Sequence, residues 1–264
     1  MKIETIIEIA HRAGTRILDV YARSGEVQFS AKEDQTPLTE ADRLSHEHIV
    51  SALRDLPGRY PVVSEEDIPE ASEIISQRAE RIWLVDPLDG TKEFIKRSGD
   101  FTVNIALMER CKSPPDGMTF QPVLGVVFVP AQGITYFASQ DSGAWKQSRD
   151  GEPQPISCRV PPDRSKLVVV ASKDHQGPMI KQMLEENPGY QLTSIGSSLK
   201  FCLVAEGSAD LYLRDQPTME WDTAAAQCVV EAAGGSVTEL DGAPLRYGKP
   251  EFRNPPFIAK GPFI

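Results

Sequence analysis

The chain has 264 residues and carries 38 acidic against 28 basic side chains, which gives a formal net charge of −10 at pH 7. This balance argues against a binder of nucleic-acid polymers or anionic membranes, because such proteins gather basic residues to meet phosphate. With 40% hydrophobic and 25% charged residues, the chain is apolar enough to build a core and too apolar for intrinsic disorder.

Signals for export and membrane insertion are missing from the sequence. No apolar stretch approaches the length of about 20 residues that a membrane-spanning helix needs. The first residues, MKIETIIEIAHRAG, lack the apolar core and cleavage site of a signal peptide. The cysteines form no CxxC pair, so they indicate neither a zinc site nor a disulfide framework. They are Cys111, Cys158, Cys202 and Cys228. We therefore expect free thiols in a reducing cytoplasm.

The first half of the chain predicts two helices followed by strands. Residues 3–21 place apolar side chains at helical spacing with charges between them, which predicts an amphipathic helix. A second helix is expected to begin at Thr39 and to end at Pro57 and Gly58. From residue 81 onward, short β-branched or aromatic runs predict an antiparallel meander. These runs are IWLV, FTVNIALM, VLGVVFVP, ITYFAS and GAWK. The first half therefore reads as two helices packed on a sheet.

The second half alternates between strand and helix patterns. Residues 149–164, RDGEPQPISCRVPPDR, are dense in proline and polar residues and mark the best boundary between halves. We place the first half at residues 1–155 and the second at residues 156–264. Strands are expected in KLVVVAS, QLTSIG, ADLYLR and SVTEL, and helices between them in 177–186, SSLKFCLVAEG and WDTAAAQCVVEAAGG. This alternation predicts an α/β half.

The segment WLVDPLDGTKEF (83–94) carries the most chemical information. An apolar strand is expected to deliver Asp86 at its carboxyl end, and Asp89 follows three residues later. Two carboxylates on one tight turn, with the Leu88 carbonyl between them, form an all-oxygen ligand set suited to Mg²⁺. The alternative is an ordinary turn, since Asp-Pro and Asp-Gly are common turn formers.

Two residues after the carboxylates could bind phosphate. Gly90 and Thr91 could offer backbone N–H groups and a hydroxyl to an anion, as turns at helix starts often do. The same residues are also compatible with a turn that has no ligand.

Further acidic residues follow short apolar runs or lie at expected helix starts. Glu65 and Glu66 follow PVV, Asp222 is expected to open a helix, and Asp42 lies three residues after Thr39. Each has a structural explanation on its own, as a solvated surface pair, a helix cap or a capping box. Their joint occurrence, each beside an apolar strand or a helix start, is harder to explain by structure alone.

Several of these motifs together resemble a known family. SEED (64–67), DPLDGT (86–91) and WD-T-A (221–224) with a following Gly-Gly are similar to the Mg²⁺-dependent, Li⁺-sensitive phosphatases of the inositol monophosphatase superfamily. The resemblance extends to KEDQTPLTEAD (32–42) and so covers nearly the whole chain. It implies the sugar-phosphatase fold, a layered α-β-α-β-α sandwich that combines the α+β half with the α/β half.

Within the superfamily, the second half resembles the 3'(2'),5'-bisphosphate nucleotidase branch. The stretches that carry this similarity are GSSLKFCLVAEGSADLYLR (196–214) and PTMEWDTAAAQ (217–227). The branch implies removal of the 3'-phosphate of adenosine 3',5'-bisphosphate to give AMP, and conversion of 3'-phosphoadenosine 5'-phosphosulfate to adenosine 5'-phosphosulfate, in sulfur assimilation. Two alternatives remain: an inositol or other sugar monophosphatase, and a phosphate-binding regulatory protein without catalysis.

The resemblance implies a metal site with two or three Mg²⁺ ions. Glu65, Asp86 and the Leu88 carbonyl would hold one ion, while Asp86, Asp89 and Asp222 would hold a second. Two metals at such a site stabilise the attacking and leaving oxygens of an in-line displacement. No cysteine or serine nucleophile is then required.

The resemblance also implies catalytic roles for three residues. Thr91 would orient the attacking water, Asp42 would accept the Thr91 hydroxyl proton, and Glu66 would hold a further water or support the site. The amides of Gly90 and Thr91 would bind the scissile phosphate.

The implied substrate contacts come from both halves. In the first half and at the metal site they are Glu65, Leu88, Asp89, Gly90, Thr91 and Asp222, and on the nucleoside side they are Ser172, His175, Ser197 and Lys200, with Arg214 as a further candidate for the distal phosphate. Hydroxyls and a cation suit a ribose and a second phosphate.

The expected partner is accordingly a small-molecule nucleotide bisphosphate, with no nucleic-acid polymer and no transmembrane segment. An oligomer is compatible with the sequence. The expected location is the cytoplasm, and the relatives implied by the resemblance extend this to the cytoplasmic face of the inner membrane.

Overall fold

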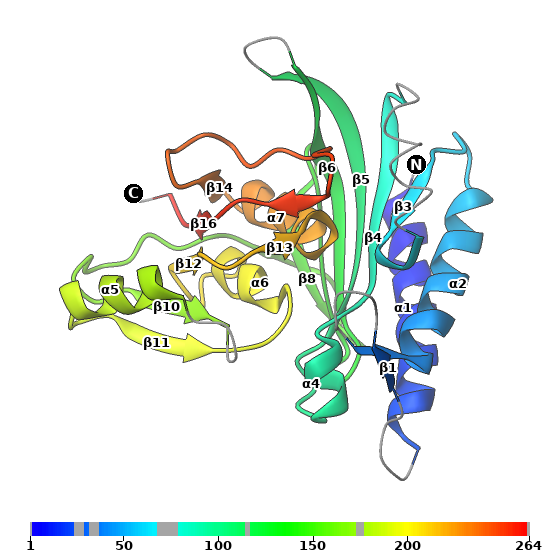
Figure 1. Ribbon diagram of the computed structural model, residues 1–264, viewed down its shortest axis with the longest axis horizontal. Helices are drawn as coiled ribbons and strands as arrows, with labels where there is room; N and C mark the ends of the chain where they lie inside the picture. Colours follow the sequence, from blue (N-terminus) through cyan, green and yellow to red (C-terminus); the bar gives the residue numbers. More distant parts are fainter. Residues whose placement is uncertain are drawn as a thin grey trace.

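Five layers of helices and sheets make up the fold (Figure 1). The structure is a computed structural model that describes residues 2–23, 29–31, 37–67, 79–113, 117–172 and 177–262. In order, the layers are a helix pair, a seven-stranded sheet, a second helix pair, a five-stranded sheet and one outer helix. This arrangement confirms the expected α-β-α-β-α sandwich.

The helices of the described residues differ in length and position. They are α1 (Ile3–Tyr21), α2 (Glu40–Arg54), α4 (Thr91–Ile95), α5 (Pro178–Glu186), α6 (Leu199–Ala205) and α7 (Ala224–Ala232), with the 3-10 turns η1 (Glu65–Asp67) and η2 (Glu220–Asp222). Among the described stretches, no helix is both long enough and apolar enough to cross a membrane. α1 matches its predicted bounds, and Thr39 is the N-cap of α2, as expected.

The first sheet has the strand order β3-β4-β5-β6-β7-β8-β9. β3 and β4 pair in parallel, and the other neighbours pair antiparallel, which confirms the predicted meander. Its strands are β3 (Val62–Ser64), β4 (Arg81–Asp89), β5 (Thr102–Ser113), β6 (Gly117–Val129), β7 (Ile134–Ser139), β8 (Gly143–Ser148) and β9 (Gln154–Ile156). Because β9 crosses residues 155 and 156, the proposed division between halves falls within an edge strand.

The second sheet has the strand order β11-β10-β12-β16-β14. β10 pairs in parallel with β11 and β12, whereas β16 pairs antiparallel with β12 and β14. Its strands are β10 (Val168–Ala171), β11 (Gln191–Ser194), β12 (Leu211–Arg214), β14 (Ser236–Glu239) and β16 (Phe257–Lys260). Two small ladders pair β1 (Phe29–Ala31) with β2 (Pro37–Thr39) and β13 (Thr218–Met219) with β15 (Arg253–Asn254).

Two large apolar cores hold the first four layers together, and two smaller clusters pack α5 on the second sheet. The faces of α1 and α2 bury their apolar side chains against one face of the first sheet. α6 and α7 pack between the two sheets, where their buried side chains join both sheets into a second core. The packing is close at Gly125 of β6, because a Cβ atom there would collide with the Ala225 carbonyl oxygen of α7.

Two local expectations are corrected by the structure. β4 does not end at Asp86 but continues to Asp89, and its register with β5 shifts between these residues. Pro87 has no N–H for the ladder, so the strand becomes irregular there instead of ending. Asp222 does not open a helix directly, since it ends η2 and α7 begins at Ala224.

Candidate functional site

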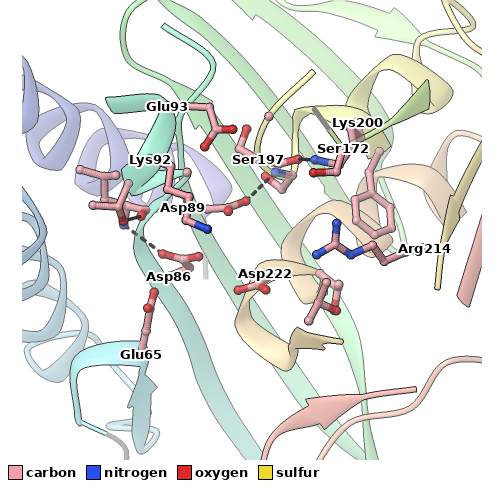
Figure 2. Close-up of a pocket in the computed structure, with 18 of the residues that line it drawn as sticks. Glu65, Asp86, Asp89, Lys92, Glu93, Ser172, Ser197, Lys200, Arg214 and Asp222 are labelled. Carbon is pink, nitrogen blue, oxygen red and sulfur yellow. Dashed lines mark hydrogen bonds between the residues drawn. The ribbon is translucent and has the colours of Figure 1, made fainter. Parts of the chain in front are cut away.

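A cavity of about 240 Å³ lies where the carboxyl end of β4 meets α6 and η2 (Figure 2). Its lining combines acidic, basic and hydroxyl side chains from both halves of the chain. The lining residues are Glu65, Asp86, Leu88, Asp89, Gly90, Thr91, Lys92, Glu93, Ser172, Gly196, Ser197, Ser198, Lys200, Phe201, Tyr212, Arg214, Thr218, Asp222 and Thr223. The structure therefore brings together most of the residues that the sequence singled out.

The irregular end of β4 holds the carboxylate of Asp86 in place. Asp86 is 1% exposed, and its Oδ1 accepts the backbone N–H of Leu88 at 3.0 Å. The hydroxyl of Ser45 on α2 donates to the Pro87 carbonyl at 2.7 Å. These two bonds hold the peptide groups between Asp86 and Asp89 in place, which is consistent with a rigid ligand turn.

Thr91 and Asp42 meet although 49 residues separate them. The Thr91 hydroxyl donates to Asp42 Oδ1 at 3.2 Å, while Asp42 Oδ2 accepts the N–H and the hydroxyl of Thr39. Asp42 therefore completes a capping box at the start of α2 and contacts Thr91 with its other oxygen. The capping interpretation and the predicted contact with Thr91 are both present in the structure.

Asp89 is held by groups from both halves. Its Oδ2 accepts the backbone N–H of Ser198 and lies 3.5 Å from both the Thr102 hydroxyl and the Asn104 amide nitrogen. The Ser198 hydroxyl in turn contacts Thr102 at 2.9 Å and Asn104 at 2.8 Å. This polar cluster ties the end of β4 to the start of α6.

The acidic side of the cavity carries charge that the protein only partly offsets. The pKa of Asp89 is raised to about 6, chiefly because burial removes water, with Lys200 and the Ser198 N–H opposing the rise and Glu93 and Glu65 adding to it. Burial likewise raises the pKa of Asp222 well above its usual range, with Asp89 and Glu65 adding to the effect. Repulsion among these carboxylates would be relieved by a cation.

The chemistry of the donor set fits a hard divalent cation. Glu65, Asp86, Asp89 and Asp222 supply carboxylate oxygens to one cavity, and such oxygens are the ligands that Mg²⁺ prefers. Within the described residues, no group of three or more His, Cys, Asp or Glu side chains already forms a metal cluster. The fit therefore rests on the donor types and on the raised pKa values.

The opposite side of the cavity is cationic and rich in hydroxyls. Lys200 is 5% exposed, and its ammonium donates to the Ser197 carbonyl at 2.6 Å. Burial lowers the pKa of Lys200 to about 8, with Asp89 opposing the effect and Arg214 adding to it. Ser172 and Arg214 line the same side. Ser197 has a φ of 50°, a conformation that is strained for a residue with a side chain.

Two of the predicted residues that the structure describes, Asp42 and Glu66, do not line the cavity, and a third cannot be placed. His175 lies outside the described residues. Asp42 reaches the site only through Thr91, as described above. Glu66 sits in η1 beside the cavity-lining Glu65, and its role stays a prediction.

Several lining residues were missed by sequence reasoning. Ser198 directly follows Ser197, which was a predicted substrate contact. The two adjacent serines in GSS were therefore the signal that could have identified Ser198 as a lining residue. Phe201 and Tyr212 form an edge-to-face pair with ring centroids 5.0 Å apart and wall the cavity. Neither residue was assigned to the site from the sequence. The proximity of Glu93 to Gly196 depends on tertiary contact between α4 and the start of α6.

The chain belongs to the inositol monophosphatase family, since the profile of the "Inositol monophosphatase family" matches residues 2–259. This confirms the resemblance that the sequence motifs indicated. The chain is 44% identical to the 3'(2'),5'-bisphosphate nucleotidase CysQ of Salmonella typhimurium over 256 residues, which cover 97% of this chain and 98% of that protein. The CysQ of Escherichia coli strain K12 matches with the same identity and coverage.

Solved structures agree with the sequence relatives. CysQ from Bacteroides thetaiotaomicron, described as a bacterial member of the inositol monophosphatase family, superimposes with a TM-score of 0.81 at 38% identity and covers 98% of this chain and 96% of its own. The Thermotoga maritima IMPase gives a TM-score of 0.75 at 25% identity, with 98% and 91% covered. The layered fold is therefore the fold of this family.

Proposed function

We propose that this protein is a Mg²⁺-dependent 3'(2'),5'-bisphosphate nucleotidase, a phosphoric monoester hydrolase that removes the 3'-phosphate of adenosine 3',5'-bisphosphate to give AMP. One observation carries the proposal: a single cavity has carboxylates on one side and Lys200, Arg214 and hydroxyls on the other. That division suits a substrate with two phosphates. The identity of 44% to the CysQ nucleotidases over nearly the whole chain supports it.

The carboxylate side would hold the metal ions. We assign two or three Mg²⁺ to Glu65, Asp86, the Leu88 carbonyl, Asp89 and Asp222, all of which line the cavity. When bound, the ions supply positive charge that stabilises the transferring phosphoryl group and activates water. The protein contributes by holding the ligand oxygens in a rigid turn and by excluding bulk water from buried Asp86.

Thr91 would orient the attacking water. Its hydroxyl donates to Asp42 Oδ1, so a lone pair of Thr91 Oγ1 is left to accept a hydrogen bond from the attacking water. Asp42 remains an acceptor because its other oxygen already receives the Thr39 N–H at 2.8 Å. The amides of Gly90 and Thr91 would bind the scissile phosphate, and Glu66 would support a further water.

The cationic side would bind the nucleoside and its second phosphate. Lys200, Ser172, Ser197 and His175 are the proposed contacts, with Arg214 as a further contact to the distal phosphate. The assignment of Lys200 is supported by its position, because this buried residue lines the cavity and its ammonium donates to the Ser197 carbonyl. The same site would remove the 3'-phosphate of 3'-phosphoadenosine 5'-phosphosulfate to give adenosine 5'-phosphosulfate and phosphate, in sulfur assimilation in the cytoplasm.

A substrate panel tests the proposal. Release of phosphate is measured from adenosine 3',5'-bisphosphate, 3'-phosphoadenosine 5'-phosphosulfate and inositol 1-phosphate, each with Mg²⁺ and with EDTA. We expect the adenosine bisphosphate to have the highest kcat/KM with Mg²⁺ and no turnover with EDTA. A higher kcat/KM for inositol 1-phosphate would instead favour a sugar monophosphatase, and no turnover of any substrate would favour a binding protein.

A further inference from the structure

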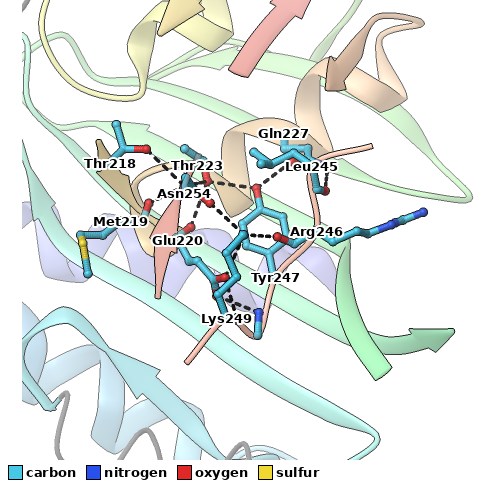
Figure 3. A network of polar contacts seen from close by, with 11 residues as sticks. Thr218, Met219, Glu220, Thr223, Gln227, Leu245, Arg246, Tyr247, Lys249 and Asn254 are labelled. Carbon is cyan, nitrogen blue, oxygen red and sulfur yellow. Dashed lines mark hydrogen bonds and ion pairs between the residues drawn. The ribbon is translucent and has the colours of Figure 1, made fainter. Parts of the chain in front are cut away.

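A buried polar network lies directly behind the turn that carries Asp222 (Figure 3). Its centre is Glu220, which is 1% exposed. The Glu220 carboxylate accepts the backbone N–H groups of Gly248 at 2.9 Å and Lys249 at 3.0 Å, and the Lys249 ammonium lies 3.0 Å from Oε1. A buried carboxylate needs such donors, because an unpaired charge in the interior is costly.

Asn254 of β15 also forms hydrogen bonds to the turn that carries Asp222. Its side-chain amide donates to the Met219 carbonyl at 2.9 Å, the Thr223 hydroxyl at 3.0 Å and the Thr218 hydroxyl at 3.2 Å. Its side-chain oxygen accepts from the Lys249 ammonium at 3.2 Å. Asn254 therefore contacts residues on both sides of Asp222 in the chain.

The main chain and α7 complete this support. The Glu220 N–H donates to the Phe252 carbonyl at 2.7 Å. The Thr223 hydroxyl lies 3.0 Å from the Tyr247 hydroxyl, which donates to Gln227 of α7 at 2.7 Å. Glu220 and Thr223 thus extend into the network, whereas Asp222 between them lines the cavity.

We infer that Lys249 and Asn254 are positioning residues for Asp222. Neither lines the cavity, so they act through the turn 219–223. Glu65, Asp89 and Asp222 line the same cavity, so repulsion between their negative charges would push the Asp222 carboxylate away from the others. A turn held by the network resists that push. Loss of the Lys249 ammonium would leave Glu220 buried with fewer donors and free the turn to move. This inference rests on the proposed role of Asp222 as a metal ligand.

The experiment compares two lysines in similar environments. Lys146 pairs with Glu206 at 2.6 Å as Lys249 pairs with Glu220, and each ammonium lies 5.3 Å from the centroid of a tyrosine ring. Lys146 contacts neither the cavity nor η2. Lys249→Met, Asn254→Ala, Lys146→Met and Asp222→Asn are compared with the wild type. Two quantities are measured without substrate: the Kd for Mn²⁺ from the electron paramagnetic resonance of free Mn²⁺, and the Tm in EDTA.

We expect Lys249→Met and Asn254→Ala to raise the Kd for Mn²⁺ by about 10-fold, the scale found when groups that orient metal ligands are removed. Lys146→Met should lower the Tm about as much as Lys249→Met does, and it should leave the Kd for Mn²⁺ unchanged. If Lys249→Met does not fold, Asn254→Ala carries the test.

Two outcomes overturn the inference, and they differ from failure of the proposed function. If Lys249→Met and Asn254→Ala keep the wild-type Kd for Mn²⁺ while Asp222→Asn weakens binding, the positioning role is refuted. An equal loss of affinity in Lys146→Met would show a general effect of stability. A wild-type Kd in Asp222→Asn would instead refute the metal assignment itself.

Discussion

The two sides of the cavity are built in different ways. On the acidic side, Asp86, Asp89 and Thr91 lie within six residues of each other at one irregular strand end, while Glu65 and Asp222 are added by η1 and η2. The cationic side collects Ser172, Lys200 and Arg214 from the ends of β10, α6 and β12. A local motif thus supplies half of the proposed metal-binding carboxylates on the acidic side, whereas the cationic side depends wholly on tertiary assembly. Each side can therefore be altered separately.

The largest expected effect comes from the acidic side. Asp89→Asn should lower kcat/KM for every phosphate ester by about 1000-fold, because a catalytic metal contributes several kcal/mol. The Tm in EDTA should stay equal or rise, because the substitution removes one member of a repelling carboxylate cluster. Phosphate release and calorimetry check both expectations. Activity at the wild-type level would show that Asp89 is not a ligand.

A smaller and more selective effect is expected from the cationic side. Lys200→Met should lower kcat/KM for adenosine 3',5'-bisphosphate by about 10- to 100-fold, since a hydrogen bond to a charged group contributes about 1.5–3 kcal/mol. Turnover of p-nitrophenyl phosphate, which has no second phosphate, should remain near the wild-type rate. Lys166→Met serves as the control, because Lys166 is exposed and pairs with Asp163 on the surface. Equal losses on both substrates would place Lys200 with the catalytic side.

The smallest effect concerns stability and pH in the metal-free protein. Folding raises the pKa of Asp89 from 3.8 to about 6, so the folded chain binds this proton more tightly than the unfolded chain. The resulting stabilisation is present below pH 3.8 and is lost as pH rises through about 6. The Tm of Asp89→Asn minus that of the wild type, measured in EDTA, should therefore increase across this range. A constant difference would contradict the raised pKa.

The sequence predicted the fold where the signal was local. The periodicity of α1 and the capping pattern at Thr39 gave both helices their starts. β16 was not predicted, because FIAK is a four-residue run after two prolines, yet it lies between β12 and β14 in the second sheet. Its position depends on pairing with strands far away in the chain.

The candidate site shows the same limit. The motif around Asp86 and Asp89 was visible because its members are adjacent in sequence. Ser198, Asn104 and Thr102 reach Asp89 only because β5 and α6 lie close together in the fold. No spacing in the sequence predicts that contact. Lys249 reads in sequence as a surface lysine, since its buried partner Glu220 is 29 residues away.

Gly125 has no reactive side chain, yet its position restricts which substitutions the fold can accept. It lies in the middle of β6 against the first turn of α7. Alanine there would press on the Ala225 carbonyl, and α7 could yield only by shifting as a unit. Asp222 lies three residues before Ala225, so the displacement would be transmitted to the acidic side of the cavity. A survey of tolerated substitutions should therefore find Gly125 as restricted as the carboxylates, although it would bind neither metal nor substrate.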